Sequence, residues 1–408
     1  MPIIELMNTV GYDVVTLGNH EFDKGREVLN TMVEHAEFDW VCCNMTDLKG
    51  GSKIKPYTTL SVAGIELCFV GVVDTDQNGH PLGGEHSYVD FSFSPDIDTA
   101  YTTSLALPDC DFKVLLSHMG QDSDRRLATR GATYDWIAGG HSHDTYNEEL
   151  NEIHISQNNK NIRYVTVADI TVCNGNIIDV TYTQINTAET VADDNISAMI
   201  EKLNASDPEL NTVEVIVNSP ATKEGVSNFT INALATYPYP EGFVPEITFY
   251  HYGGIRLDGF NEGELKRVDI LNNDPFVSTI YTGEMTTEQI EEFILVKYNN
   301  GTAESPDKES HYPYFRSDFE YTIVLNDEPA ERPDALRLIH NLESRRYRVA
   351  MCNYVAENYI DKEVVANQLQ NTGITVREAM LRYARTFTEG YTPDNASRQS
   401  EVRISELK

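Results

Sequence analysis

The chain has 408 residues, 31 Lys and Arg against 64 Asp and Glu, and a formal net charge of -33. This length is enough for two or three domains with separate cores. The negative field excludes nucleic acid and anionic membrane surfaces as partners, so an anionic substrate requires local cations, either metal ions or Arg. No apolar run reaches the length of a membrane span, and no signal peptide is visible after Met1.

The six cysteines do not follow the spacing of a zinc site or of a small disulfide-bonded scaffold. They stand at positions 42, 43, 68, 110, 173 and 352. Most of them lie in apolar stretches, such as Glu66–Val70 around Cys68. We therefore expect buried free thiols.

Residues 1–190 alternate strand and helix patterns, which predicts an α/β domain. The apolar run Asp13–Leu17 is followed by an amphipathic helix over Arg26–Glu37. A short buried strand is predicted over Val41–Asn44, and a β-hairpin over Tyr57–Val73.

The hydrophobic period changes to two between residues 151 and 184, which predicts antiparallel strands that close the first domain. The Asn174-Gly175 pair within this stretch suits a type I′ turn. Residues 191–220 are predicted to be a linker that carries a helix over Val191–Asn204, and residues 221–408 to be the second domain.

In the second domain, Glu224–Leu234 is predicted to be helical. Glu246–Tyr250 has a strand pattern and leads into the glycine-rich segment Gly253–Arg256. Residues 301–311 are polar and contain a proline, which predicts a surface loop. Thr375–Thr386 is predicted to be the terminal helix.

Three apolar strands of the first domain end in segments that carry Asn or His. These segments are Gly18–Asp23, the end of Val114–Gly120, and the end of Trp136–Asp144. Ligands commonly gather at the carboxyl edge of an α/β sheet. One such segment alone is more often a plain turn, but the three together predict a metal site.

These three segments, together with Gly253–Arg256 and Asp274–Phe276, resemble the two-domain 5'-nucleotidases of the calcineurin-like metallophosphoesterases. The resemblance implies an α/β protein with two domains. The first is an N-terminal calcineurin-like α/β/β/α sandwich, here missing its first strands. The second is a C-terminal α+β nucleotide-binding domain.

The resemblance also implies two divalent metal ions, for which Zn, Mn, Co or similar ions suit imidazole and oxygen ligands. Asn19, His118 and His141 match the ligands of one metal, and His143 matches a ligand of the other. His20 matches the histidine that stabilises charge on the transferring phosphoryl group, and we expect Asp23 to orient its imidazole. These catalytic and metal-binding assignments concern the following residues: Asn19, His20, Asp23, His118, His141 and His143.

Each assignment has an alternative. His118 taken alone can be a satisfied histidine at the end of a strand. His143 can be an exposed turn residue, because a His-Ser-His sequence places both rings on one side only in an extended backbone.

The family's pattern begins upstream with an Asp-x-His strand and a Gly-Asp segment whose carboxylate bridges the metals. The residues before Gly18 carry no histidine, and no Asp-x-His occurs in the sequence. We therefore expect a fragment or truncated gene model that holds at most one weakly bound metal ion, or none, and retains little hydrolase activity.

In the second domain the resemblance implies that Arg256 contacts the substrate and that Phe276 forms one wall of a base-stacking site. Stacking tolerates different bases because every base has a π-face. His251 stands where the family usually has Asn and can still donate a hydrogen bond, and Tyr359 is the candidate for the second aromatic wall. Alternatively, Phe276 is a core residue and Arg256 an internal ion-pair partner.

The implied function is metal-dependent hydrolysis of a nucleoside monophosphate to nucleoside and phosphate. The same residues of the first domain serve a 2',3'-cyclic nucleotide phosphodiesterase or a nucleotide-sugar diphosphatase. The alternative from another class is a non-catalytic nucleotide-binding protein that has lost its metals. The family implies a periplasmic or extracellular location for the full-length protein.

Overall fold

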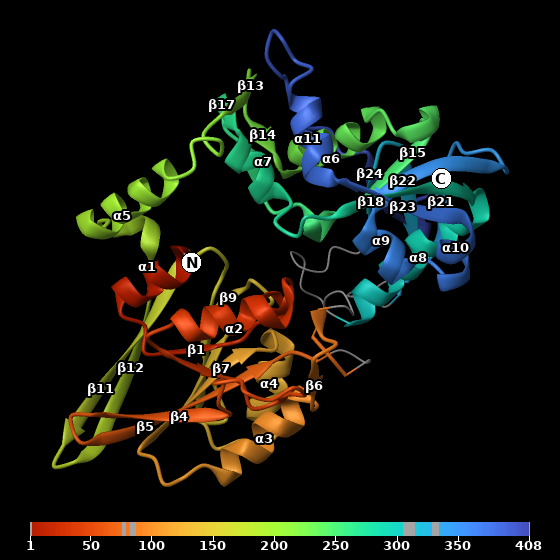
Figure 1. Cartoon of the computed structure of the whole chain (residues 1–408). Coiled ribbons are helices and arrows are strands. Elements are labelled where there is room, and N and C mark those ends of the chain that lie inside the picture. Colours follow the sequence, from red (N-terminus) through yellow and green to blue (C-terminus); the bar gives the residue numbers. More distant parts are fainter. Residues whose placement is uncertain (1, 76–78, 82–86, 305–314, 329–333, 408) are drawn as a thin grey trace. The chain divides into compact units, whose positions relative to one another are not determined.

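The computed structural model describes residues 2–75, 79–81, 87–304, 315–328 and 334–407 (Figure 1). The chain divides into two compact units, Met1–Leu203 and Asn204–Lys408. The described residues of each unit form their own buried apolar clusters.

The first unit is built around a six-stranded sheet with the order β4-β5-β7-β8-β10-β9. Its four inner strands run parallel, and β4 and β9 pair antiparallel at the two edges. Further strands form the pairs β1-β2, β3-β6 and β11-β12. The elements in chain order are α1 (Pro2–Val10), β1 (Val14–Thr16), α2 (Gly25–His35), β2 (Asp39–Val41), β3 (Met45–Asp47), β4 (Tyr57–Val62), β5 (Ile65–Val73), β6 (Phe91–Phe93), α3 (Asp96–Ala106), β7 (Phe112–His118), α4 (Gln121–Thr129), β8 (Trp136–Gly139), β9 (Thr145–Leu150), β10 (Ile153–Asn158), β11 (Tyr164–Cys173), β12 (Asn176–Asn186) and α5 (Asp194–Ala205).

These elements form four layers. The parallel pair β1-β2 contacts β5 and β7 on one face of the six-stranded sheet, and α3 and α4 contact the other face. Leu29 and Val33 of α2 are buried in the cluster that includes Trp40 of β2 and covers the outer side of the pair. The two strand layers approach most closely at Gly71, where a Cβ would lie 2.1 Å from the carbonyl oxygen of Val41. Glycine is required at this point because any side chain would separate the layers.

Several predicted elements of the first unit are present. Helix α2 and the hairpin β4-β5 lie where the sequence predicts them, and β11 and β12 form the antiparallel hairpin that extends as a long two-stranded ribbon in Figure 1. Its turn has φ of 53° at Asn174 and 78° at Gly175, as a type I′ turn requires.

Two expectations for the first unit are wrong. The strand predicted over Val41–Asn44 ends at Val41, because the N–H groups of Cys42 and Cys43 donate instead to the carbonyls of Lys55 and Gly71. Cys68 is not a free thiol but forms a disulfide with Cys110, 42 residues further along the chain. The bridge joins β5 to the residues just before its neighbour β7.

The second unit has a five-stranded mixed sheet with the order β19-β15-β22-β18-β23 and a three-stranded sheet with the order β21-β20-β24. Helices α6 and α9 contact the larger sheet, and α11 contacts α6. Its elements in chain order are β13 (Val213–Val217), β14 (Ala221–Thr222), α6 (Lys223–Thr236), β15 (Ile247–His251), β16 (Gly259–Phe260), β17 (Gly263–Lys266), α7 (Arg267–Asn273), β18 (Thr279–Thr286), α8 (Thr287–Glu304), β19 (Phe315–Ser317), β20 (Tyr321–Leu325), β21 (Ala335–His340), β22 (Arg346–Cys352), α9 (Asn353–Tyr359), α10 (Lys362–Gln368), β23 (Leu369–Thr375), α11 (Val376–Ala384) and β24 (Gln399–Arg403).

Helices α6 and α11 and strand β15 lie where the sequence predicts them. Residues 301–304 of the predicted loop instead continue α8, and residues 305–311 lie outside the described part of the chain. Strand β13 falls within the stretch predicted as linker, yet it pairs antiparallel with β17 of the second unit.

Candidate functional site

The three segments that end in Asn or His meet at one edge of the first unit. The short 3₁₀ helix Asn19–Phe22 follows β1, His118 is the last residue of β7, and His141 follows the end of β8. Strand β1 contacts β7, and β7 pairs in parallel with β8, so the three carboxyl ends are neighbours. The fold therefore delivers these side chains to one place.

Asn19, His118 and His141 are brought together there. Asn19 is 5% exposed, and its Oδ1 lies 3.0 Å from Nε2 of His118. The imidazoles of His118 and His141 have centroids 5.0 Å apart and planes inclined by 62°. A Cβ on Gly18 would lie 2.8 Å from Cε1 of His118, so the missing side chain of Gly18 provides the space for this ring.

His20 lies on the same 3₁₀ helix with its side chain 46% exposed. Its Nδ1 is 3.0 Å from Oδ2 of Asp23, so the carboxylate holds one nitrogen of the ring. The carboxylate of Glu21 accepts a hydrogen bond of 2.7 Å from the N–H of Gly18. This bond closes the turn that presents Asn19 and His20.

The backbone at His141 and His143 is not extended, and an extended backbone is the condition under which a His-Ser-His sequence places both rings on one side. His141 has φ of 77° and His143 has φ of 62°, both in the left-handed region. The buried hydroxyl of Ser142 between them donates to Oε1 of Gln157 at 2.7 Å and accepts from the N–H of Gln121 at 3.2 Å. Such strained backbone persists only where surrounding contacts enforce it, and it is concentrated at functional sites.

The electrostatics of this edge keep the imidazoles of His118 and His141 neutral. Burial, together with the nearby imidazoles of His141, His20 and His143, holds the pKa of His118 well below its usual range. Burial and the neighbouring His20 lower the pKa of His141 to about 4. Both rings are therefore neutral at neutral pH, and a neutral imidazole is the form that binds a metal ion.

The residues predicted for substrate binding lie in the second unit as two pairs. The guanidinium of Arg256 lies 5.3 Å from the ring centroid of Phe276, and its Nη1 donates to the carbonyl of Gly253 at 3.3 Å. His251 and Tyr359 have nearly parallel rings with centroids 6.3 Å apart. The hydroxyl of Tyr359 accepts a hydrogen bond of 2.9 Å from the ammonium of Lys297.

The residues at the edge of the first unit suit a divalent cation in donor type. They offer one amide oxygen and several imidazole nitrogens, which is a set that Zn, Mn or Co accepts. Within the described ranges, no group of three or more His, Cys, Asp or Glu side chains is already spaced around a metal position. The direct contact between Asn19 and His118 occupies two of the donor atoms.

Residues 207–362 match the family model described as "5'-nucleotidase, C-terminal domain". The chain is 24% identical to the trifunctional nucleotide phosphoesterase protein YfkN of Bacillus subtilis, in an alignment that covers 91% of this chain and 30% of that protein. It is 25% identical to a 5'-nucleotidase of Vibrio vulnificus over 72% of this chain and 63% of that enzyme. The solved structure of a 5'-nucleotidase precursor from Thermus thermophilus aligns with a TM-score of 0.80 and 17% identity, covering 98% of this chain and 86% of that one.

These comparisons support the resemblance of the chain to the 5'-nucleotidases. The chain has a mixed α/β fold, which is similar to that of the solved 5'-nucleotidase precursor. The chain spans less than two thirds of both relatives, 30% of one and 63% of the other.

Next to the candidate site lies a polar network that the sequence pattern did not predict. Asp124 of α4 is fully buried, and its two oxygens accept hydrogen bonds from Ser117 Oγ at 2.5 Å and from the Tyr146 hydroxyl at 3.1 Å. Ser117 immediately precedes His118 in β7. The sequence does contain a pattern that indicates the burial of Asp124. Leu127 and Ala128 follow it at helical spacing, which places Asp124 on the apolar face of the helix.

Asp124 gives the first testable prediction. Burial raises the pKa of its carboxyl group to about 7, so the folded chain favours the protonated form. The protonated Asp124 therefore stabilises the fold fully below about pH 3.9, the pKa of an aspartate in the unfolded chain. This contribution to the free energy of unfolding is lost as the pH rises through the pKa of Asp124 in the folded chain. We expect Asp124→Asn to remove this part of the decline in stability between pH 4 and 7, as measured by urea unfolding with a chelator present.

The wild-type chain, unfolded under the same conditions, is the control, because its many other carboxylates contribute equally to both proteins. Parallel stability curves for the two proteins across that pH range would contradict the prediction.

Proposed function

We propose that this chain hydrolyses nucleotide phosphoesters, converting a nucleoside monophosphate to nucleoside and phosphate, with a divalent cation held by Asn19, His118 and His141. The observation that carries the proposal is the convergence of one amide oxygen and two neutral imidazoles, from three separate segments, at one edge of the first unit. In this proposal His143 is a ligand of a second cation, and its imidazole is close enough to that of His118 to influence the pKa of His118.

A divalent cation, when bound, supplies the charge that neutralises phosphoryl oxygens and the acidity that makes hydroxide available at neutral pH. The side chains of the chain supply the rest. His20 presents Nε2 to a phosphoryl oxygen, and Asp23 fixes its orientation by holding Nδ1 at 3.0 Å. A positioned donor of this kind acts where charge develops in the transition state.

The second unit contributes the nucleotide-binding residues in this proposal. Arg256 offers a cation next to the aromatic face of Phe276, so charge and stacking surface lie side by side. Such a local cation is needed in a chain of net charge -33, which otherwise repels a nucleotide. His251 and Tyr359 are assigned to the same function as a donor and an aromatic surface.

We also propose a periplasmic or extracellular location. The Cys68–Cys110 disulfide supports it, because disulfides persist in oxidising compartments. Among the helices of the described ranges, none has the length and apolar character needed to cross a membrane.

The experiment that tests the function is phosphate release from AMP by the purified chain, with Mn²⁺ or with a chelator. We expect slow release, because the Asp-x-His and bridging-carboxylate segments are missing from this sequence, and we expect it to require Mn²⁺ and to be restored when the metal is returned after chelation. A folded chain that binds Mn²⁺ and AMP but releases no phosphate would contradict the proposed hydrolysis and favour a nucleotide-binding protein.

A further inference from the structure

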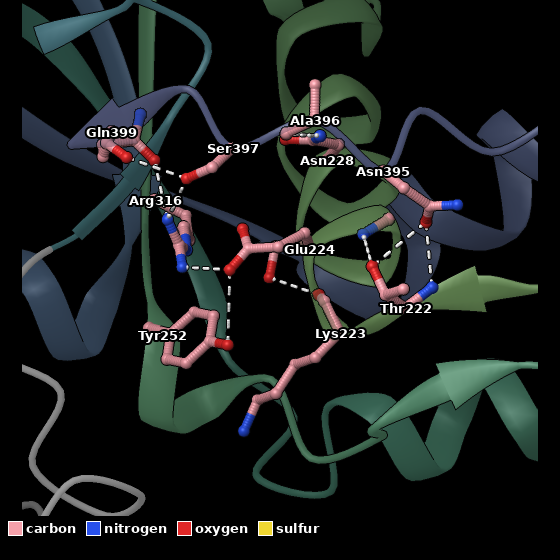
Figure 2. A network of polar contacts seen from close by, with 12 residues as sticks. Thr222, Lys223, Glu224, Asn228, Tyr252, Arg316, Asn395, Ala396, Ser397 and Gln399 are labelled. Carbon is pink, nitrogen blue, oxygen red and sulfur yellow. Dashed lines mark hydrogen bonds and ion pairs between the residues drawn. The ribbon is translucent and has the colours of Figure 1, made fainter.

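A network of polar contacts surrounds Tyr252, the residue directly before the Gly253-Gly254 pair (Figure 2). The guanidinium of Arg316 lies 4.2 Å from the Tyr252 ring centroid, and the ammonium of Lys223 lies 4.7 Å from it. The Tyr252 hydroxyl donates to Oε1 of Glu224 at 3.5 Å. Tyr252 is 6% exposed, so these contacts are made away from water.

Arg316 joins several elements of the second unit at this ring. It stands on β19, opposite Tyr250 of β15, and forms an ion pair with Glu224 at the start of α6. Its Nη1 also donates to Gln399 Oε1 of β24 at 3.2 Å and to Ser397 Oγ at 3.5 Å. Arg316 is 3% exposed, and its planar guanidinium group is held in this position by several hydrogen bonds.

The turn that follows Tyr252 carries Arg256. The N–H of Ile255 donates to the carbonyl of Tyr252 at 3.0 Å, and Nη1 of Arg256 donates to the carbonyl of Gly253 at 3.3 Å. A Cβ on Gly254 would lie 3.0 Å from the Tyr250 ring, so the turn is closely packed on its strand. The backbone of Tyr252 is thus tied by a hydrogen bond to the turn that carries Arg256.

We propose that Arg316 is a positioning residue for nucleotide binding, which acts by clamping Tyr252 and thereby fixing the Gly253–Arg256 turn. The proposal rests on the proposed function for the role of Arg256, but the clamp itself is independent of it. Arg316 is not assigned a contact with substrate.

The test compares Arg316→Met with wild type in AMP hydrolysis. Loss of a contact made equally in ground and transition states raises KM and leaves kcat unchanged, so we expect KM to rise by about 10-fold with kcat within about 2-fold. Arg316→Lys keeps a positive charge over the Tyr252 ring but loses the planar set of hydrogen-bond donors of the guanidinium. The KM of this variant should therefore rise less than that of Arg316→Met. A variant that is merely less stable would lose active protein, which lowers kcat and leaves KM unchanged.

Arg398→Met is the matched control, because Arg398 is also a mostly buried arginine of the second unit, paired with Asp394 rather than with the Tyr252 network. Tyr252→Leu provides a second variant that removes the stacked ring while keeping an apolar side chain. An unchanged KM in both folded variants, Arg316→Met and Tyr252→Leu, would overturn the proposal.

Hydrogen–deuterium exchange separates this inference from the proposed function. In Arg316→Met we expect faster exchange for the amides of Tyr252–Arg256 than in wild type or Arg398→Met. If wild type neither binds nor hydrolyses AMP, the proposed function fails, while faster exchange in this turn still supports the clamp. Unchanged exchange in the turn overturns the clamp whatever the activity.

Discussion

Replacement of His118 by alanine should abolish the retention of a divalent cation and reduce phosphate release from AMP by about 100-fold or more. Groups that only orient metal ligands change affinity or activity by about 10–100-fold, and removing a ligand is expected to exceed that range. His118 is central to the site, since it contacts Asn19 and lies against His141. The measurements are the Mn²⁺ bound per chain by calorimetry and the initial rate of phosphate release.

The control for this substitution is His35→Ala. His35 is an exposed histidine of α2 whose Nδ1 lies 2.8 Å from a carbonyl of its own helix, so its loss should leave metal and activity unchanged. Retention of Mn²⁺ and of the wild-type rate in His118→Ala would remove His118 from the proposed ligand set and, with it, the geometry on which the function rests.

Replacement of Gly18 by alanine should have a large effect on the same site without touching any ligand. The new Cβ would lie 2.8 Å from Cε1 and 2.9 Å from Nε2 of His118, so the imidazole must move. Gly18 has φ of -105° and ψ of 179°, an extended conformation that alanine adopts without strain. We expect Mn²⁺ affinity and activity to fall by about 10–100-fold, as for other changes that misorient a ligand.

Gly11→Ala is the control for Gly18→Ala, because it adds the same methyl group at a position with a strained backbone but no crowding. Gly11 has φ of 88° and open space around it, so alanine there should cost about 1 kcal/mol of stability and leave metal binding unchanged. In a double variant, Gly18→Ala should add no further loss to His118→Ala, because both act on one imidazole. Independent, multiplied losses would show that Gly18 acts through another group.

The sequence was most informative where a local pattern determines the structure. Asn19, His118 and His141 could be predicted to meet because each follows an apolar strand and the carboxyl ends of parallel strands share an edge. The pairing of His20 with Asp23 follows from a separation of three residues in a helical turn. Their roles as ligands and catalytic groups stay predictions.

Features that depend on distant residues could not be predicted. The left-handed backbone at His141 and His143 is held by Ser142 through Gln157, which belongs to β10. Asp124 meets Ser117 and Tyr146 only after three elements have packed. Single-sequence periodicity carries no information about such contacts, because each partner alone has an ordinary environment.

The Cys68–Cys110 bridge has a consequence for the alignment of the candidate site. Cys68 lies in β5, whose neighbour β7 begins two residues after Cys110 and ends at His118. If β7 slid by two residues along β5, the imidazole would travel about 6.6 Å along the strand, while a shift by one residue would turn it to the opposite face. A disulfide between the first half of β5 and the residue two before β7 forbids either slip. Refolding with the disulfide formed should therefore give a single strand register, and refolding under reducing conditions a mixture of registers.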